Sequence, residues 1–533
     1  MRTTSVRRRF VGAGFVTITM VTGIVVAAPT ASGDDINETR GLRNAVTLEG
    51  VREHQQALQT IADNNGGNRF AGTSGYDASA DYVVGKLQAA GYTVTRDPFT
   101  FDYSADRTPP AFEQISPTAV TYTPDVQFSS FTFSPSGDVT APLTAVDLVI
   151  PATGPANTST SGCQATDFAG FPAGTIALIQ RGTCPFGTKA ANAAAAGASA
   201  VVIFNEGQAG RTATIAGTLG GKQSHSAPVI GTSFAIGDDL SNGVLNGPTG
   251  STVRVRVDRL NETRTTQNII AETAAGDPNN VVVVGAHLDS VSSGPGINDN
   301  GSGSAGILEI AEQFAARGIV PRNKVRFIWF GAEELGLLGS TSYVSRLSPA
   351  QLAQIRLNLN FDMIGSPNFV RFVYDGDNSK FPVGPGSADG PQGSGEIERV
   401  FHDYFASQGL ASSETAFSGR SDYGPFIAKG IPAGGLFTGA EGVKSAQEAA
   451  IYGGTAGMAY DPCYHLACDN YANNSDTGLD QMVDAAAQAT LIFAKRNYAK
   501  SPLVDPAGPV SGSTSTPGGG GLHDDHDHEE LES

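Results

Sequence analysis

The feature that most constrains the fold is an alternation of apolar strands and helices in the second half of the chain. Residues 281–284 form a continuous run of four valines, which is typical of a central parallel strand that is buried on both faces. The periodicity that follows predicts a helix, a strand, a helix and a strand, over residues 304–317, 325–330, 337–347 and 357–361. This order predicts an α/β fold with a mixed, mostly parallel central sheet flanked by helices.

Two other parts of the chain are expected in the same α/β domain. Residues 51–101 have the spacing of a helix, a turn, a second helix and a strand, and Gly91 ends the second helix. A last helix is expected from about Asp480 to Tyr498. We therefore predict a discontinuous domain with a first part at residues 29–109 and a main part at residues 259–500.

The segment between these parts, residues 110–258, differs in composition and is rich in Thr, Ser, Gly, Pro and Val. Short strand-like runs occur at residues 148–150 and 176–179. A helix of small residues at 189–196 ends at Gly197 and precedes an apolar strand at 200–204. The pattern predicts a compact, β-rich insert.

Residues 1–28 have the pattern of a secretory signal peptide, with a basic start, an apolar stretch and small residues up to Ala28. The alternative is a single membrane anchor, but the apolar stretch is short and Pro29 follows it. Residues 7–11, Arg-Arg-Arg-Phe-Val, also resemble a twin-arginine signal, so the general and the twin-arginine export routes both stay open. We expect a secreted protein with no membrane association once the signal is removed.

The charge of the chain argues against one class of partner. Lys and Arg number 34 against 52 Asp and Glu, so the formal net charge is −18 at pH 7. Nucleic acid binding requires clustered basic side chains that replace phosphate counterions. We therefore expect no nucleic acid partner.

The four cysteines fall into two local pairs, Cys163 with Cys184 and Cys463 with Cys468. In an exported chain, an even number of locally paired cysteines favours disulfides over free thiols. Metal binding is the alternative, but neither pair has a second CxxC-like partner. Residues 501–533 are rich in Pro, Gly, Ser and Thr and end in histidines among acids, which predicts a disordered, solvated tail rather than a metal site.

Side chains that commonly bind metals follow the predicted strands of the α/β domain. In open α/β sheets, ligands bind beyond the carboxyl ends of the strands. The positions in question are His287 and Asp289 after the first strand, Asp299 in a Gly- and Asn-rich loop, Glu333 and Glu334 after the second strand, Asp362 after the third, and His465 much later.

Each of these residues has a structural alternative when it is taken alone. Asp299 is also suited to a turn, Asp362 to a cap, and two adjacent glutamates to a solvated surface. Their convergence on one sheet edge makes coincidence a poor explanation. The remaining histidines outside the tail have no marked context, and we interpret them as structural or surface residues: His54, His225 and His402.

Two imidazoles with several carboxylates suit catalytic zinc, which takes nitrogen and oxygen ligands. Two metal ions need a carboxylate that can bridge them, and Asp299 in its Gly-flanked loop can present both oxygens. A catalytic base is also needed close to the metals, and the adjacent Glu333 and Glu334 can divide the roles of base and ligand.

These motifs resemble those of the co-catalytic zinc metallopeptidases of family M28, in particular the secreted bacterial leucine-type aminopeptidases. The matching segments are His287-Leu288-Asp289-Ser290, Asn298-Asp299-Asn300-Gly301, Gly331-Ala332-Glu333-Glu334, Asn360-Phe361-Asp362-Met363, Cys463-Tyr464-His465 and, near the start, Asn64-Asn65-Gly66-Gly67-Asn68-Arg69. The resemblance covers residues 50–108 and 260–498 and implies a zinc-exopeptidase fold.

The resemblance implies a role for each site residue. Two zinc ions would be bound, one by His287 and Asp362 and the other by Glu334 and His465, with Asp299 as the bridge. Glu333 would be the general base for a metal-activated water, Tyr464 would stabilise the oxyanion, and Asp289 would hydrogen-bond His287. The substrates would be peptides with free N-termini and preferably large apolar first residues.

The same resemblance implies positions at the substrate and at a calcium site. Arg420 would lie near the substrate backbone, Met363 and Phe437 would line the apolar pocket, and the bridge between Cys463 and Cys468 would brace the loop that presents Tyr464 and His465. Asp480 and Asp484 match part of a calcium site of the secreted enzymes. The early acids of that site are missing, because the matching positions lie around Ala45 and Val46. The sequence therefore argues against a complete calcium site.

The insert resembles a protease-associated (PA) domain, through Gly162-Cys163, residues 176–182, Cys184-Pro185-Phe186 and Ala196-Gly197-Ala198. Two interpretations of this domain stay open, a lid or substrate filter and a stabilising appendage.

We expect a monomer. The sequence also argues against three other functions. A carboxypeptidase or a glutaminyl cyclase would share the fold, but no basic cluster for a terminal carboxylate is present. A receptor-like binding protein would have lost metal ligands that are all retained here.

Overall fold

The computed structural model describes residues 39–152 and 154–506, and every structural statement below concerns these residues. The predicted signal peptide and residues 507–533 of the predicted tail lie outside the described residues. Residues 502–506, which we also assigned to the tail, lie against the rest of the chain, where Asp505 Oδ1 accepts hydrogen bonds from the backbone N–H groups of Gly393 and Gly395, both at 2.9 Å.

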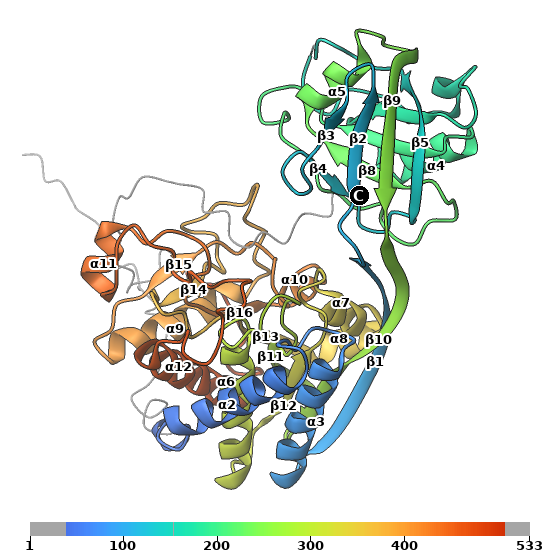
Figure 1. Ribbon diagram of the computed structural model, residues 1–533. Coiled ribbons are helices and arrows are strands. Elements are labelled where there is room, and N and C mark those ends of the chain that lie inside the picture. The colour runs from blue at the N-terminus through green and yellow to red at the C-terminus, as the bar shows by residue number, and fades with distance from the viewer. Residues whose placement is uncertain (1–38, 153, 507–533) are drawn as a thin grey trace, which may run out of the picture.

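The larger part of the chain is built on an eight-stranded mixed sheet, which confirms the predicted α/β fold (Figure 1). Parallel pairing joins β12, β11, β13 and β16 at its centre, and antiparallel strands flank this centre. From one edge to the other, the strands are β1 (Thr93–Asp106), β10 (Arg259–Glu272), β12 (Asn323–Phe330), β11 (Asp277–His287), β13 (Ile355–Phe361), β16 (Ala433–Phe437), β14 (Phe372–Tyr374) and β15 (Ser413–Thr415).

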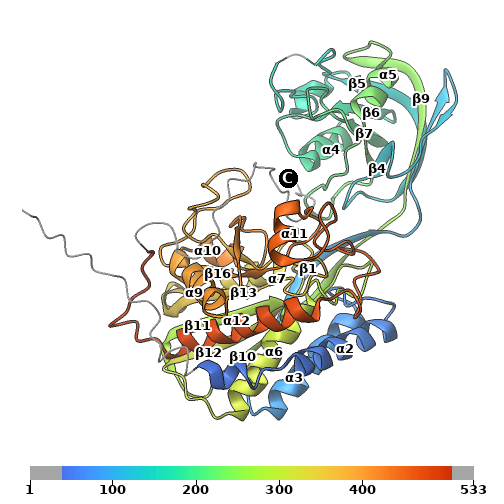
Figure 2. The same ribbon diagram turned by 90° about the vertical axis from the view of Figure 1, so that its left-hand side faces the viewer.

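Helices cover both faces of this sheet (Figure 2). Successive side chains of a strand point to opposite faces, so an apolar strand packs against helices on both sides. Val282 and Val284 of β11 pack on one face with α2 (Leu48–Asn64), α3 (Ser74–Ala89), α6 (Gly301–Ala316), α9 (Ser394–Ser407) and α12 (Asp476–Lys495). Val281 and Val283 pack on the other with α7 (Leu338–Ser345), α8 (Pro349–Gln354) and α10 (Gly424–Ile427). The valine run predicted as a doubly buried strand is at most 1% exposed, as the sequence analysis expected.

The residues between β1 and β10 form a second eight-stranded sheet with helices on it. In sheet order its strands are β3 (Val120–Thr121), β2 (Ala111–Ser116), β9 (Gly247–Val257), β5 (Gly137–Val146), β6 (Ile176–Gln180), β7 (Ala200–Phe204), β8 (Val229–Thr232) and β4 (Phe128–Ser130), and its helices are η1 (Ala165–Phe168), α4 (Phe186–Ala195) and α5 (Phe234–Ser241). The long antiparallel strands β1 and β10 connect the two bodies, as Figure 1 shows.

One prediction for this second body, a strand at residues 148–150, is wrong. Residues 148–150 lie beyond the end of β5 and are not a strand. The side chain of Gln180 takes the place of a neighbouring strand, since its Oε1 accepts the N–H of Val149 at 2.9 Å and its Nε2 donates to the carbonyl of Val149 at 3.1 Å. Because the side-chain amide of Gln180 satisfies both backbone groups of Val149, these groups do not pair with a neighbouring strand.

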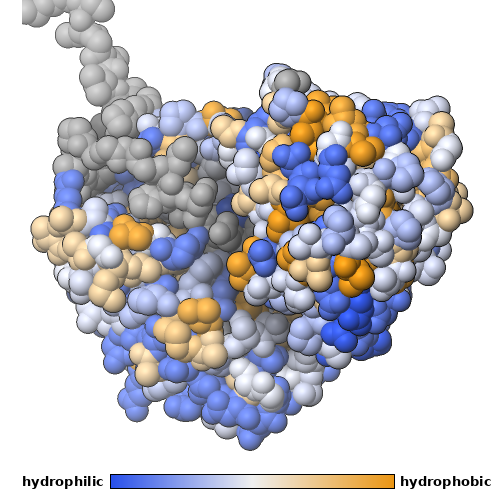
Figure 3. All heavy atoms as spheres, turned by 45° about the horizontal axis from the view of Figure 1, so that its top comes forward, coloured by the Kyte–Doolittle hydropathy of each residue, from blue (hydrophilic) through white to orange (hydrophobic). Residues whose placement is uncertain are grey.

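Both predicted cysteine pairs form disulfides, Cys163–Cys184 in the second body and Cys463–Cys468 in the loop before α12. Among the described residues, no helix is long and apolar enough to cross a membrane. On the face drawn in Figure 3, hydrophobic residues form small groups among hydrophilic ones.

Candidate functional site

The carboxyl ends of the central strands bring the predicted metal-type side chains together. His287 is the last residue of β11, Glu333 and Glu334 follow β12, and Asp362 follows β13. Asp299 lies just before α6, and His465 comes from the loop between the paired cysteines Cys463 and Cys468. Parallel strands end at the same sheet edge, so residues far apart in sequence meet there.

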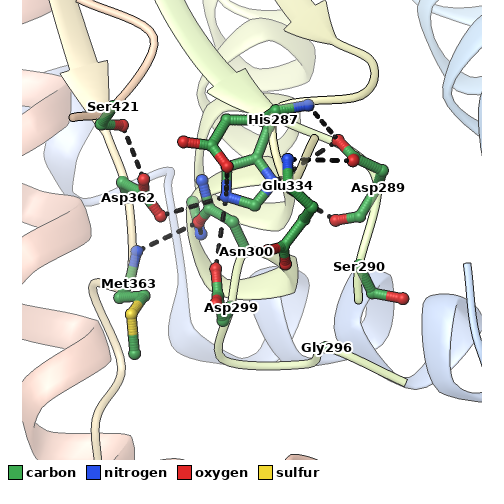
Figure 4. A network of polar contacts seen from close by, with 12 residues as sticks. His287, Asp289, Ser290, Gly296, Asp299, Asn300, Glu334, Asp362, Met363 and Ser421 are labelled. Carbon is green, nitrogen blue, oxygen red and sulfur yellow. Dashed lines mark hydrogen bonds and ion pairs between the residues drawn. The ribbon is translucent and has the colours of Figure 1, made fainter. Parts of the chain in front are cut away.

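One half of the site surrounds the imidazole of His287. Its Nε2 lies 3.3 Å from Asp299 Oδ1, 3.3 Å from Asp362 Oδ1 and 3.9 Å from Glu333 Oε2. Figure 4 shows Asp299 and Asp362 directed at this ring from two sides. Asp362 is held in turn by Ser421, whose Oγ donates to Asp362 Oδ2 at 2.6 Å.

The other half surrounds the imidazole of His465. Its Nε2 lies 3.1 Å from Glu334 Oε2 and 3.3 Å from Asp299 Oδ2. The two oxygens of Asp299 therefore face two different imidazoles, Oδ1 toward His287 and Oδ2 toward His465. This is the arrangement that a carboxylate bridging two metal ions requires.

The backbone of the Asp299 loop is fixed by Asp469, a residue to which the sequence analysis gave no role. The backbone N–H groups of Asn298 and Asp299 donate to its two carboxylate oxygens, at 2.8 and 3.0 Å. Asp469 directly follows Cys468 in the sequence. Its closeness in sequence to His465 is the only local signal of a role at the site.

The resemblance implies a hydrogen bond between Asp289 and His287, but the Asp289 carboxylate has other partners. Its Oδ1 lies 3.6 Å from His287 Nδ1, too far for a hydrogen bond, and its own backbone carbonyl lies nearer to that nitrogen, at 3.2 Å. The carboxylate instead accepts the backbone N–H groups of Glu333 at 3.2 Å and Glu334 at 3.3 Å. Asp289 thus connects the end of β11 to the glutamate pair (Figure 4).

Arg69 is completely buried beneath the loops that carry His287 and Asp299, and it contacts both of them. Its guanidinium donates to the carbonyls of Leu288, Pro295 and Gly296, the last two at 2.9 and 2.6 Å. Burial lowers the pKa of Arg69 to about 10, while the nearby carboxylates Asp289 and Asp469 act in the opposite direction. The side chain therefore stays charged at neutral pH and ties the His287 loop to the Asp299 loop.

The charge at the centre calls for a cation. Burial, followed by the charge of Asp299, raises the pKa of Glu334 to about 7. Burial lowers the pKa of His465, but the hydrogen bonds with Asp299 and Glu334 outweigh it and raise that pKa to about 11. The carboxylates thus stabilise positive charge strongly at this point.

The donor set fits zinc. Imidazole nitrogen and carboxylate oxygen are common zinc ligands. The Glu334 side chain is 2% exposed, and its Oε2 faces His465 Nε2 at 3.1 Å, whereas its Oε1 has no hydrogen-bond partner. A buried carboxylate of this kind is costly unless a cation neutralises it.

A second buried acid, Asp422, lies beside the base candidate Glu333 and was missed by the sequence analysis. It is fully buried, and its two oxygens have no hydrogen-bond partner. Burial, and then the charge of Glu333, raises the pKa of Asp422 well above its ordinary value. Its position after Arg420 and Ser421 in the sequence carried no signal of this burial.

An apolar wall adjoins the metal-type residues. Met363 follows Asp362 with a left-handed φ of 49°, and its N–H donates to Asn300 Oδ1 at 3.2 Å. Met363 belongs to a buried cluster with Phe437, Tyr374, Phe417 and Tyr423, against which Tyr464 packs. A recess beside this cluster is lined by Tyr374, Thr415, Ala416, Ser418, Arg420, Ser421 and Phe437.

Tyr464 stacks on His465, with ring centroids 3.8 Å apart. Burial and then the charges of Asp299 and Glu334 raise the pKa of Tyr464 well above its ordinary value. Its phenol therefore stays protonated at neutral pH and able to donate a hydrogen bond.

The residues that matched a calcium site lie apart from this centre, on α12. Burial raises the pKa of Asp484 to about 6, and the positive charge of Arg43 opposes the shift. The hydroxyl of Tyr404 donates to Asp484 Oδ2 at 3.3 Å, and Arg43 lies over the Tyr404 ring at 5.3 Å. Asp484 thus already has a positively charged neighbour, and burial raises the pKa of Asp480 as well.

Comparisons with known proteins identify the relatives of this chain. Residues 268–490 match Peptidase family M28, and residues 139–240 match the PA domain. An aminopeptidase of Pseudomonas aeruginosa is 49% identical over 452 residues, which are 84% of this chain and 81% of that protein. Leucine aminopeptidase 2 of Arthroderma otae is 38% identical over 499 residues, which are 93% of both proteins.

Solved structures give the same result. An aminopeptidase from Aneurinibacillus sp. strain AM-1 covers 88% of this chain and 98% of its own, with a TM-score of 0.64 and 26% identity. A zinc aminopeptidase from Bacillus subtilis covers 86% and 97%, with a TM-score of 0.54 and 25% identity. Because a relative that is 49% identical covers 84% of the chain, the chain belongs to peptidase family M28, and it carries an inserted PA domain.

Proposed function

We propose that this protein is a secreted aminopeptidase with two zinc ions, which removes large apolar residues from the N-termini of peptides. The observation that carries the proposal is the position of Asp299 between two imidazoles, with Oδ1 3.3 Å from His287 and Oδ2 3.3 Å from His465. The aminopeptidase names of the relatives and the zinc aminopeptidase of similar fold support it.

The proposed ligands follow from the two halves of the site. His287 and Asp362 would hold one zinc ion, His465 and Glu334 the other, and Asp299 would bind both. Bound zinc would supply an acidified water and a positive charge for the substrate carbonyl. We do not propose a calcium ion at Asp480 and Asp484, since Arg43 already places a positive charge near Asp484.

Glu333 is the proposed general base. Its carboxylate is 2% exposed, lies 3.9 Å from His287 Nε2, and is oriented through the backbone bond to Asp289. It would accept a proton from the attacking water and pass it to the amine of the leaving peptide. Tyr464, kept protonated, would donate a hydrogen bond to the oxyanion that forms on the substrate carbonyl.

The substrate would lie along the apolar wall. Met363 and Phe437 would contact the first side chain, and Arg420, which lines the same recess, would lie near the peptide backbone. The free amine of the substrate would lie near the buried carboxylates of the centre, which would favour N-terminal residues over internal ones.

The domain organisation and the location of the protein are also proposals. We propose export through the signal at residues 1–28, a PA insert at residues 110–258, and a monomeric enzyme whose two-part domain comprises residues 29–109 and 259–500. The two disulfides support the extracellular location. A lid and a stabilising appendage both remain roles to be tested for the insert.

The test is hydrolysis of a panel of aminoacyl-p-nitroanilides by the mature protein, before chelation, after chelation and after zinc is restored. Rapid release from the leucine substrate, lost on chelation, regained with zinc and absent in Glu333→Ala, is the expected result. Protein that binds zinc but hydrolyses no substrate with a free amine would refute the aminopeptidase proposal.

A further inference from the structure

A second group of metal-type side chains lies away from the site above, on α9 and β15. Glu398 and His402 stand one helical turn apart on α9, and both side chains are completely buried. Glu414 of β15 contributes a carboxylate oxygen, and the three ligand atoms all lie within 4.8 Å of one another. From its sequence context, His402 was expected to be a structural or surface residue.

The two buried side chains are each tied at one atom and lack a hydrogen bond at the other. His402 Nδ1 lies 2.8 Å from Ser412 Oγ, and Glu398 Oε2 accepts the N–H of Gly376 at 2.9 Å. His402 Nε2 and Glu398 Oε1 are buried without a hydrogen-bond partner and lie 3.6 Å apart. The two atoms therefore face each other without a hydrogen bond between them.

The charges around this space are mostly negative. The strongest charged neighbours of Glu398 are His402, Asp377 and Asp375. Burial raises the pKa of Glu398 to about 7, and the two aspartates act in the same direction while His402 opposes it. Asp375 and Asp377 place carboxylate oxygens within 4.8 Å of that of Glu398. The Asp375 oxygens accept the backbone N–H groups of Ser379, Lys380 and Phe381, whereas Glu398 Oε1 has no hydrogen-bond donor and is costly to bury unless a cation joins it.

We propose that Glu398, His402 and Glu414 bind one divalent transition-metal ion, such as Zn²⁺ or Mn²⁺. In a buried pair without a metal, the two atoms would close to hydrogen-bond distance, about 2.7–3.2 Å. Ligands about 2.0–2.1 Å from a tetrahedral zinc ion lie roughly 3.3 Å from one another, near the separation seen here. A nitrogen ligand together with carboxylates favours zinc or manganese over calcium, which prefers oxygen ligands throughout.

Such an ion would join α9 to β15 just behind the recess of the main site. In the parallel pair of β14 and β15, Val373 is opposite Glu414 and Tyr374 is opposite Thr415. Thr415 lines the recess, whereas Glu414, its neighbour in the chain, is one of the three proposed ligands. The ion would stabilise this wall from outside, and its binding does not depend on the proposed catalytic function.

The test is zinc titration by calorimetry of full-length mature protein in which other metal sites are removed. The background carries Asp299→Asn and His465→Ala at the main centre, and His523→Ala, His526→Ala and His528→Ala in the tail. Two variants of this background are then made, His402→Gln and Glu414→Gln. The matched control is Asp389→Asn, whose side chain is exposed in the connection between β14 and α9. Circular dichroism establishes that each variant is folded.

The background protein and Asp389→Asn should each bind one Zn²⁺ and melt at a higher temperature with it. His402→Gln should bind none. Glu414→Gln should bind at least about tenfold more weakly, and this variant decides the question if His402→Gln fails to fold. Equal zinc affinity in all variants would overturn the proposal, as would uptake of Ca²⁺ but neither Zn²⁺ nor Mn²⁺. A folded background protein that binds no metal ion would also overturn it and leave Glu398 and His402 as a buried pair.

Discussion

The backbone N–H of Asp299 donates a hydrogen bond to Asp469 Oδ2 at 3.0 Å, and this bond fixes the direction of the carboxylate that faces both imidazoles. The N–H of Asn298 donates to the other oxygen of Asp469 at 2.8 Å. Asp469 is 2% exposed, so no water replaces these bonds readily. The position of Asp299 between the two imidazoles thus depends on a residue that is not among the proposed metal ligands.

The first prediction concerns this residue. Asp469→Asn turns an amide N–H₂ toward one of the two backbone donors and removes one hydrogen bond. We expect kcat/KM for leucine p-nitroanilide and zinc affinity each to fall about 10- to 100-fold, as for other residues that orient metal ligands. Asp476→Asn, at an exposed position, is the control and should keep both values. Wild-type zinc affinity and activity in Asp469→Asn would contradict the role.

The second prediction separates the two adjacent glutamates. Glu333→Gln should lower kcat by about 10²- to 10⁴-fold, because the proton acceptor is lost, and leave two zinc ions per chain. Glu334→Gln should reduce the zinc content, because its carboxylate is a proposed ligand. Elemental analysis of dialysed protein beside steady-state kinetics checks both. The opposite pattern, with zinc lost in Glu333→Gln and retained in Glu334→Gln, would exchange the two roles.

The third prediction concerns stability. Arg69→Met leaves the carbonyl oxygens of Leu288 and Pro295 buried without a donor, and it removes one of the two hydrogen bonds to that of Gly296, which still accepts the N–H of Gly301 at 3.0 Å. We expect the free energy of unfolding to fall by about 3 kcal/mol or more, measured by urea denaturation. Arg96→Met is the matched control, because its ion pair with Asp81 is exposed, and it should cost less than about 1 kcal/mol. Equal losses in the two variants would refute this account of Arg69.

The fourth prediction uses the two disulfides as a matched pair. Cys463→Ser with Cys468→Ser frees the loop that carries Tyr464 and His465, so kcat/KM should fall at least about tenfold. Cys163→Ser with Cys184→Ser changes the insert only, so hydrolysis of a small nitroanilide should stay within about twofold at a temperature where both proteins are folded. Equal loss of activity in the two variants would show that the effect is not local to the loop.

The fifth prediction is a pH dependence of the insert. Lys189 is completely buried, and burial lowers its pKa to about 8, while Glu206 and Asp167 oppose the shift. Between pH 8 and the unfolded value near 10.5, the unfolded chain binds the proton that the folded chain has lost. Stability must therefore rise with pH in this window, by up to about 3 kcal/mol.

Chemical denaturation of the insert, followed at several pH values from 7 to 10.5, measures this rise. Lys189→Met should abolish it, whereas Lys222→Met, at a position that is not buried, should retain it. The same pH dependence in Lys189→Met and in the unchanged chain would assign it to another group.

Much of the fold and many of the site residues could be predicted because their signals are local. The four valines at 281–284 predicted a doubly buried strand, which is β11, and the strand ends pointed to His287, Glu333, Glu334 and Asp362. Cysteine spacing predicted both disulfides. These inferences needed only periodicity and the rule that parallel strands end at one edge.

The residue roles that could not be predicted depend on contacts between distant segments. Arg69 donates to carbonyls about 220 positions later, Asp469 accepts from an amide 170 positions earlier, and Gln180 replaces the strand expected at residues 148–150. The cluster of the buried Glu398 and His402 with the half-buried Glu414 is of the same kind.

The sequence by itself determined which side chains stand at the strand ends, because hydrophobic periodicity is a property of neighbouring residues. Only the tertiary structure decided which buried polar groups hold those side chains in place. A lone Arg or Asp carries no local mark of burial, and its hydrogen-bond partners are set by how the sheet, helices and loops pack in three dimensions.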